Sequence, residues 1–254
     1  MAGKYERFRN FSYEIPKYLL PLSNRNILYY VLESFNIDEN FKKVLLVANE
    51  RDVRFQSQIQ SLLNEFDSNG ELIFIPDTLG QSITALKGLE HLHQQNTNDS
   101  VIIHNIDTIL LNRDFSLFKN KLKKYDCVVD TFYSNNNSYS YILSEDNNVV
   151  DIIEKHKISD EASSGCYCFS NISDSIKYLN KSENYYISDG IKFMIKDGKK
   201  VTIDETKVNA KIKELQIAHD KLAYQRKRAF EYPSFADQLD DIYHNGIDGW
   251  KKTI

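Results

Sequence analysis

The sequence predicts an α/β fold in which a mixed, mostly parallel β-sheet packs between helices, with a helical appendage at the C-terminus. Apolar runs bounded by turn residues alternate with amphipathic segments in the first half of the chain, an order typical of parallel strands joined by helices. Hydrophobic residues make up 41% of the 254 residues, which is enough to bury one large core. Past about residue 208 the pattern becomes helical and highly charged.

The first half of the chain supplies the parallel strands. Apolar runs at 43–49 and 71–76 are typical of buried strands, and the amphipathic segment 56–66 between them predicts a helix. A second helical pattern at 82–95 precedes another apolar run at 100–107. This β, α, β, α order favours helices on both faces of the sheet.

From about residue 127 the pattern indicates an antiparallel extension of the sheet. The expected elements are strands at 127–133 and 165–170, a hairpin turning at 146–148, a helix over 188–196 that Gly198 ends, and a strand at 199–204. Cys166 and Cys168 are two residues apart, so in a strand they lie on one face. We interpret them as reduced core cysteines.

We predict two domains, 1–207 and 208–254. In the second, a long amphipathic helix stops at Pro233, and a short helix begins at Ser234 with Asp237 in a capping-box-like position and ends at "HNG". Such a tail packs on its own domain or on a second copy. Packing on a second copy would give a homo-oligomer formed through the C-terminal helices.

Composition excludes two classes of partner. The formal net charge is −4, and Lys and Arg are scattered among the acids, so no basic stripe follows a nucleic-acid backbone. No apolar run approaches the roughly 20 residues of a membrane helix, and the N-terminus has no apolar signal segment. The expectation is a cytoplasmic protein that binds neither nucleic acid nor membrane.

Candidate phosphate ligands cluster near the N-terminus. A turn at Ala2 and Gly3 offers backbone N–H groups to a phosphate. Arg7 follows four residues later, and Lys17 comes after Pro16, which fixes the local backbone. A tight turn with two cations suits the triphosphate of a nucleotide.

Further candidates follow the predicted strands. Gly80 and Gln81 come after the strand at 71–76, at the carboxyl edge where parallel sheets bind ligands. Gln81 either recognises a base edge or caps a helix. Asn105 and Asp107 end the next strand in "HNID". Asp107 is either a ligand of Mg²⁺, which proteins hold through one or two carboxylates, or the cap of a turn.

The collinear order of "AGKYERF", "PKYLLPL", "TLGQSITAL", "HNID", "VVDIIEKHKISDEASSGCYCFS" and "YYISDGIKFMIKDGKKV" resembles the sugar-phosphate nucleotidyltransferases, the NDP-sugar pyrophosphorylases and their cytidylyltransferase relatives. The resemblance covers about residues 1–205 and implies the GT-A-like, Rossmann-like nucleotidyltransferase fold. It also implies that a nucleotidyl group passes from an NTP to a sugar phosphate or similar small phosphate. Mg²⁺ would be required and pyrophosphate released, in nucleotide-sugar or surface-glycan biosynthesis.

The resemblance assigns a role to each matching residue. Arg7 and Lys17 are the expected catalytic cations, and Asp107 is the expected metal ligand. The expected nucleotide-binding residues are Ala2, Gly3, Gly80, Gln81 and Asn105. The expected residues for the phosphorylated acceptor are Glu154, Lys155 and Gly165. Cations and a metal that neutralise developing charge do most of the work in this chemistry.

The first strand of the family has no counterpart in the sequence. In the family this strand runs straight into the glycine loop, and here Met1 stands where it would end. Either the start is an internal Met or a central strand has been lost. Loss of a central strand would expose two sheet edges and cost several kcal/mol.

Two departures favour an alternative, a catalytically inactive module that binds a nucleotide or a sugar. Tyr5 stands where the family has a second loop glycine, and the family's second metal aspartate aligns with Val208 or Asn209. Asp204 and Glu205 are nearby acids that could substitute for it. A glycosyltransferase of the same broad fold is a further alternative, but its expected DxD-type metal pair is not found.

The tail has a resemblance of its own. The stretch from Tyr224 to Ile254, "YQRKRAFEYPSFADQLDDIYHNGIDGWKKTI", is similar to the C-terminal stretch of phage tail-fibre and tail-assembly proteins. This implies a viral or mobile-element gene. It leaves a third alternative, a phage-associated structural or interaction protein in which the tail is the functional part.

Overall fold

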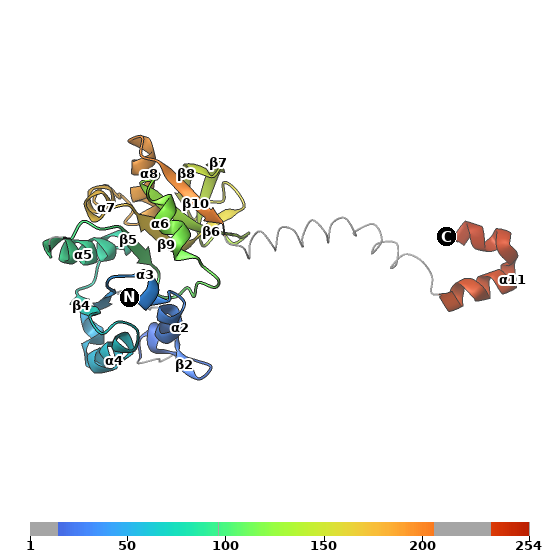
Figure 1. Cartoon of the computed structure of the whole chain (residues 1–254). Helices are drawn as coiled ribbons and strands as arrows, with labels where there is room; N and C mark the ends of the chain where they lie inside the picture. The colour runs from blue at the N-terminus through green and yellow to red at the C-terminus, as the bar shows by residue number, and fades with distance from the viewer. Residues whose placement is uncertain (1–14, 96, 206–234, 254) are drawn as a thin grey trace. The chain divides into compact units, whose positions relative to one another are not determined.

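The computed structural model describes residues 15–95, 97–205 and 235–253 (Figure 1). The chain divides into two compact units, Met1–Thr206 and Lys207–Ile254. In the first unit the helices are α2 (Ile27–Glu33), α3 (Ile37–Asn40), α4 (Gln56–Phe66), α5 (Gln81–Gln94), α6 (Phe115–Lys121), α7 (Ile172–Leu179) and α8 (Ile187–Lys196), with 3₁₀ turns at Lys17–Leu19 and Glu50–Phe55. The strands are β1 (Pro21–Leu22), β2 (Arg25–Asn26), β3 (Leu45–Asn49), β4 (Glu71–Ile75), β5 (Val101–His104), β6 (Cys127–Tyr133), β7 (Ser140–Glu145), β8 (Asn148–Glu154), β9 (Glu161–Phe169) and β10 (Val201–Glu205).

The larger strands form a parallel pair, β3 with β4, and a six-stranded sheet in the order β5-β9-β6-β10-β8-β7. In the six-stranded sheet β6 and β10 are parallel neighbours, and the other neighbours are antiparallel. The prediction of a mixed sheet is confirmed, but the prediction of mostly parallel pairing is wrong. The β7–β8 hairpin returns the chain across the sheet, so that β9 enters antiparallel between β5 and β6. An apolar run does not reveal its partners.

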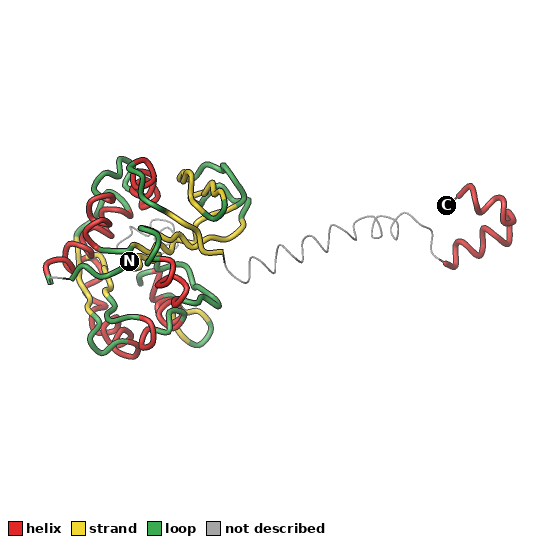
Figure 2. Tube along the Cα trace, turned by 45° about the horizontal axis from the view of Figure 1, so that its top comes forward, coloured by secondary structure: helices red, strands yellow, loops and turns green. Residues whose placement is uncertain are grey.

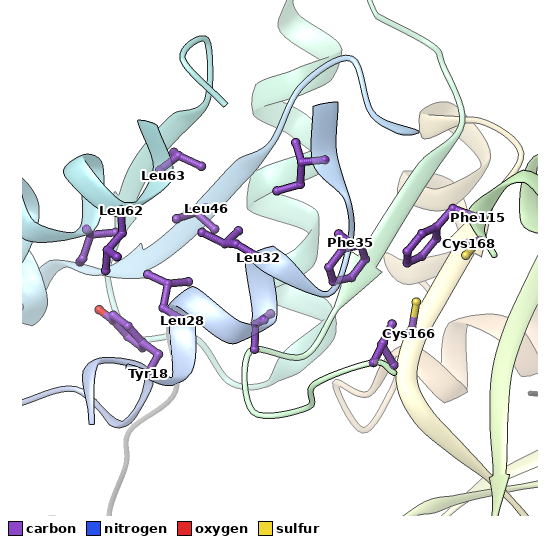
Figure 3. Close-up of a cluster of buried hydrophobic side chains, with 14 of the residues drawn as sticks. Tyr18, Leu28, Leu32, Phe35, Leu46, Leu62, Leu63, Phe115, Cys166 and Cys168 are labelled. Carbon is purple, nitrogen blue, oxygen red and sulfur yellow. The ribbon is translucent and has the colours of Figure 1, made fainter. Parts of the chain in front are cut away.

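The six-stranded sheet has a hydrophobic cluster on each face. Cys166 and Cys168 of β9 face the first cluster, with residues of α2, α4 and α6 (Figure 3). Tyr167 and Phe169 face the second, which α5, α7 and α8 cover. Figure 2 shows helices, in red, around the strands, in yellow. Both cysteines are buried and free, which confirms the predicted alternation and the interpretation of core cysteines.

Local sequence explains how the helices begin and end. Asn171 begins α7 because its Oδ1 accepts a hydrogen bond from the Asp174 amide at 2.7 Å. Gly198 follows α8 with a φ of 78°, and the Lys199 amide donates to the Met194 carbonyl at 3.0 Å. This is the left-handed stop that the sequence predicts. Across the described ranges, each helix is too short or too polar to cross a bilayer.

The second unit is described over α11 (Phe235–Thr253). Gly246 interrupts its helical geometry with φ 69° and ψ 175°, so the predicted stop at "HNG" is confirmed, although a helical stretch resumes beyond it. Leu239, Tyr243 and Ile247 are exposed. The expected long helix ending at Pro233 lies outside the described residues. The domain boundary, self-association and the phage-like role stay predictions.

Glu71 joins the amino end of β4 to α5. Its carboxylate accepts hydrogen bonds from Lys43 and Gln95 and pairs with His91 Nε2 at 2.7 Å. The hydrogen bond from Lys43, followed by that of His91, lowers the pKa of Glu71 from 4.5 to about 2. Because the folded-state pKa is depressed, this stabilisation is present above about pH 4.5 and is lost as the pH falls toward 2.

We expect Glu71→Gln to remove this part of the acid sensitivity, about 1 kcal/mol after screening of a partly exposed group. The free energy of unfolding in urea, compared at about pH 6 and about pH 3, measures it. Glu90→Gln is the matched control, because Glu90 lies on α5 in an exposed pair with Lys87. An equal acid-induced loss of stability in the parent and in Glu71→Gln would contradict the prediction.

Candidate active site

The carboxyl ends of β3, β4 and β5 lie at one edge. Asn49 closes β3, and its Nδ2 donates to Asp77 Oδ1, just past β4, at 2.9 Å. Gln81, also past β4, donates from Nε2 to Asn105 Oδ1, just past β5. These contacts join the loops that follow three strands, in the position where sheets of this kind bind ligands.

Lys17 and Asp107 form an ion pair at this edge. Lys17 Nζ donates to Asp107 Oδ2 at 2.7 Å, although the two residues are 90 positions apart. Lys17 belongs to a 3₁₀ turn that begins after Pro16, where the Leu19 amide donates to the Pro16 carbonyl at 2.9 Å. Tyr18 in that turn is fully buried and donates its hydroxyl to Asp52 at 2.9 Å. The buried turn therefore holds the lysine in place.

The charge of Asp107 is set by two opposing effects. Desolvation raises the pKa of its carboxyl, but the hydrogen bond and positive charge of Lys17 outweigh desolvation, and the pKa lies below its usual value. The side chain of Asp107 is 54% exposed. Asp107 is thus an ionised, accessible carboxylate that already faces one cation.

Asn105 is fixed between the start of α5 and β9. Its side-chain oxygen accepts the hydrogen bond from Gln81, and its backbone N–H donates to the Gly165 carbonyl at 3.0 Å. Gly165 lies where β9 shifts register against β6, with a φ of 85°. A Cβ placed there would lie 2.8 Å from Asn105 Cγ. Glycine is needed here both for its backbone conformation and for the space that Asn105 occupies.

Gly80 allows the loop before α8 to approach α5. A Cβ at Gly80 would lie 2.7 Å from the Tyr185 carbonyl oxygen, and that oxygen accepts a hydrogen bond from the Ser82 amide at 2.8 Å. Tyr185 has a φ of 64°. The loop around Tyr185 is therefore attached directly to the N-terminus of α5.

Glu154 and Lys155, at the end of β8, contact the same loop and the start of α8. Ser188 Oγ donates to Glu154 Oε2 at 3.1 Å, and Ser140 Oγ donates to the same oxygen. Lys155 Nζ donates to the Tyr186 hydroxyl at 2.8 Å and lies 4.8 Å from the centre of that ring. The adjacent residues Tyr185 and Tyr186 thus connect this pair to Gly80.

Both residues of the Lys17–Asp107 ion pair line a cavity of about 1160 Å³. Five of the predicted residues line it: Lys17, Gly80, Gln81, Asn105 and Asp107. The acceptor candidates Glu154, Lys155 and Gly165 are not in its lining. The structure therefore brings the predicted nucleotide and metal residues together and leaves the acceptor residues beside them.

Comparison with known proteins decides the family. The family model described as nucleotidyl transferase matches residues 1–213, most of the chain. The chain belongs to this family. The bifunctional protein GlmU of Campylobacter fetus is 27% identical over 209 residues, which are 75% of this chain and 45% of the relative. GlmU of Clostridium tetani is 24% identical over 215 residues, 79% of this chain and 45% of the relative. The chain spans about half the length of these curated relatives.

Solved structures share the fold. The nucleoside-diphosphate-sugar pyrophosphorylase from Vibrio cholerae superposes with a TM-score of 0.71 at 22% identity, covering 82% of this chain and 91% of that one. A UDP-glucose pyrophosphorylase from Acinetobacter baumanii superposes with a TM-score of 0.63 at 14% identity, covering 81% and 84%. The predicted α/β nucleotidyltransferase fold is confirmed.

The predicted phosphate-binding turn lies outside the described residues, and with it the predicted residues Ala2, Gly3 and Arg7. Their roles stay predictions. So do the roles of the described candidates, whose positions are now known.

The residues present fit a magnesium ion held jointly with a nucleotide. Within the described ranges no group of three or more His, Cys, Asp or Glu side chains could hold a metal alone. Mg²⁺ is commonly bound through one or two carboxylates together with substrate phosphates. Asp107 offers such a carboxylate. Asp204 does not join it, because Asp204 is buried and lies on β10, three places from β5 in the sheet.

The sequence did not predict that Tyr185 contacts the start of α5 and that Tyr186 contacts Lys155. Adjacent tyrosines are more often residues at the edge of a core. One signal was available. "YYISDG" begins a helix with a polar first turn, which marks Tyr185 and Tyr186 as loop residues at a helix start. The sequence does not tell which residues they contact.

Proposed function

We propose that this nucleotidyl transferase moves a nucleoside monophosphate from an NTP to a sugar phosphate and releases pyrophosphate. The observation that supports it most strongly is the ion pair of Lys17 with Asp107, two residues that line the cavity. The printed names of the Vibrio cholerae and Acinetobacter baumanii structures add support, since both are pyrophosphorylases of sugar nucleotides.

In the proposed reaction an ionised phosphate oxygen of the acceptor attacks the α-phosphorus of the NTP. The new P–O bond forms as the bond from the α-phosphorus to the β-phosphate oxygen breaks, and pyrophosphate leaves with that electron pair. The attacking oxygen carries no proton, so no general base is needed. Catalysis then depends on positioning and on neutralising charge.

The chain's own residues supply those two requirements. Lys17, held by its buried turn, places an ammonium beside the phosphates and stabilises the charge that develops on them. Asp107 would hold Mg²⁺, which when bound neutralises phosphate charge. Gln81 and Asn105, fixed to each other, offer amide groups to the nucleotide. Gly80 lets the Tyr185 loop pack against the start of α5.

The acceptor side is proposed to lie at the end of β8. Lys155 supplies a cation for the acceptor phosphate, and the Tyr186 ring and hydroxyl hold its ammonium. Glu154, positioned by Ser140 and Ser188, offers a carboxylate to sugar hydroxyl groups. Its two serine donors keep that carboxylate at one fixed place.

Release of pyrophosphate from a panel of the four NTPs tests the proposal, with glucose 1-phosphate, N-acetylglucosamine 1-phosphate and phosphocholine as acceptors. We expect release only when an NTP and an acceptor are both present. Chelation of divalent metal should abolish it, and added Mg²⁺ should restore it. Nucleotide binding without release for every pair would support the inactive-module alternative and overturn the proposal.

A further inference from the structure

Tyr167 is a buried polar residue that the proposed reaction does not use. It lies in β9, and only 3% of its surface is exposed. Burial raises the pKa of its hydroxyl group to about 12, although hydrogen bonds with Ser163 and Ser140 act in the opposite direction. The charge of Glu154 also raises this pKa. Tyr167 is therefore a protonated phenol within electrostatic reach of Glu154.

The bulge in β9 brings Tyr167 close to Ser163. Against β6, Tyr167 pairs with Val129 and Ser163 pairs with Thr131. In a regular strand, the four residues from Ser163 to Tyr167 would span about 13 Å. Because Val129 and Thr131 are only two residues apart, Tyr167 and Ser163 lie at adjacent positions on one face of the sheet. Gly165 allows this bulge with its φ of 85°.

Ser140 of β7 joins Tyr167 to Glu154. Ser140 pairs with Glu154 across β7 and β8, and the next residue, Tyr141, pairs with Ala162 of β9. Ser140 therefore lies between Glu154 and the polar part of β9. Its Oγ donates to Glu154 Oε2, and the same oxygen can accept a hydrogen bond from Tyr167.

The hydrogen bonds of this cluster run in one direction. A carboxylate only accepts, so Ser140 donates its proton to Glu154 and accepts the proton of Tyr167. Tyr167 in turn accepts from Ser163, whose Oγ accepts from the Gly165 amide at 3.1 Å. Each hydroxyl group both donates and accepts, and each bond strengthens the next. The chain of bonds thus runs from Gly165 to Glu154, two residues expected to contact the acceptor.

We propose that Tyr167 is a positioning residue that, through Ser140, holds the Glu154 carboxylate in place to accept a hydrogen bond, and so selects acceptors that carry a hydroxyl group there. The inference rests on the proposed function, because it takes Glu154 to face the acceptor. Among the described residues, Ser140 and Ser188 both donate to Oε2 of Glu154, which leaves Oε1 for that hydroxyl group. An analogue without the hydroxyl group would leave a fixed carboxylate oxygen unpaired.

Binding of sugar 1-phosphates to the full chain tests the inference. Titration calorimetry is done with and without α,β-methylene analogues of the NTPs, which cannot release pyrophosphate. Glucose, galactose and N-acetylglucosamine 1-phosphates identify the tightest ligand, which is then compared with its monodeoxy analogues. We expect the parent to bind that ligand about 50-fold more tightly than one of the analogues, the effect of one hydrogen bond to a charged group. In Tyr167→Phe this ratio should fall to about fivefold, with the affinity for the nucleotide analogue unchanged.

Tyr141→Phe is the matched control. Tyr141 is also fully buried, but its hydroxyl group donates to the carbonyl oxygens of Ser134 and Asn136. Both variants lose one buried hydroxyl group, so both should melt about 4 °C below the parent. Only Tyr167→Phe should lose discrimination between the sugar phosphates. Ser140→Ala breaks the chain of bonds one step nearer to Glu154 and should lose at least as much.

Three results would overturn the inference: an unchanged ratio in Tyr167→Phe, an equal loss in Tyr141→Phe, or a parent that binds no sugar phosphate or does not distinguish the analogues. Because calorimetry needs no turnover, the test separates the two proposals. Discrimination that depends on Tyr167, found without pyrophosphate release from any NTP, would contradict the proposed function alone. Pyrophosphate release with an unchanged ratio in Tyr167→Phe would contradict this inference alone.

Discussion

Lys17→Met should lower the rate of pyrophosphate release by about 100- to 1000-fold, the size of effect seen when one donor to a developing negative charge is removed. The variant keeps the length and apolar stem of the side chain, so the buried turn around Tyr18 is preserved. The charge that this substitution removes is proposed to stabilise the transition state. We therefore expect kcat and kcat/KM to fall together, as steady-state kinetics with the best NTP and acceptor pair would show.

Lys42→Met is the matched control. Lys42 also pairs with an aspartate, Asp99, and lines the same cavity, but these two residues precede β3 and β5 in the chain. Its side chain is 84% exposed, so its ion pair contributes little to stability. We expect its turnover to stay within about twofold of the parent. Equal losses in both variants would show that general charge, and not the position of Lys17, supports the reaction.

Much of the fold follows from local sequence pattern. The apolar runs that became β3, β4 and β5 were bounded by turn residues, and the 3.6-residue period of α4 was clear. Pairing order was not available, because β9 has the same apolar character whichever strands lie beside it. The mostly parallel prediction failed for that reason.

The candidate site was predictable where it depends on strand ends. Asn105 and Asp107 come just after β5, and Gln81 begins the helix that follows β4. Ligand sites in α/β folds are built from such positions beyond strand ends. Asp204 also ends a strand, and Lys121 reaches it from α6. That contact depends on how α6 packs on the sheet. A partner 83 positions away in the sequence leaves no local signal.

Gly165→Ala is expected to destabilise the protein and to weaken nucleotide binding at the same time. The left-handed φ of 85° costs a residue with a Cβ about 1–2 kcal/mol. The contact with Asn105 adds about 2 kcal/mol of overpacking. Asn105 must then move, which breaks its bond from Gln81. We expect the KM for the NTP to rise about tenfold, the equivalent of one lost hydrogen bond.

Gly198→Ala separates the two contributions. Gly198 has nearly the same backbone conformation, with a φ of 78°, but a Cβ there meets nothing within 4 Å. Gly198→Ala should therefore lower the free energy of unfolding only by the cost of a left-handed φ, about 1–2 kcal/mol. Its KM for the NTP should be unchanged. Urea unfolding and steady-state kinetics on both variants measure the difference. If Gly165→Ala were no worse than Gly198→Ala in both measurements, the space at Gly165 would not be needed to hold Asn105 in place. Its glycine would then serve only the backbone turn in β9.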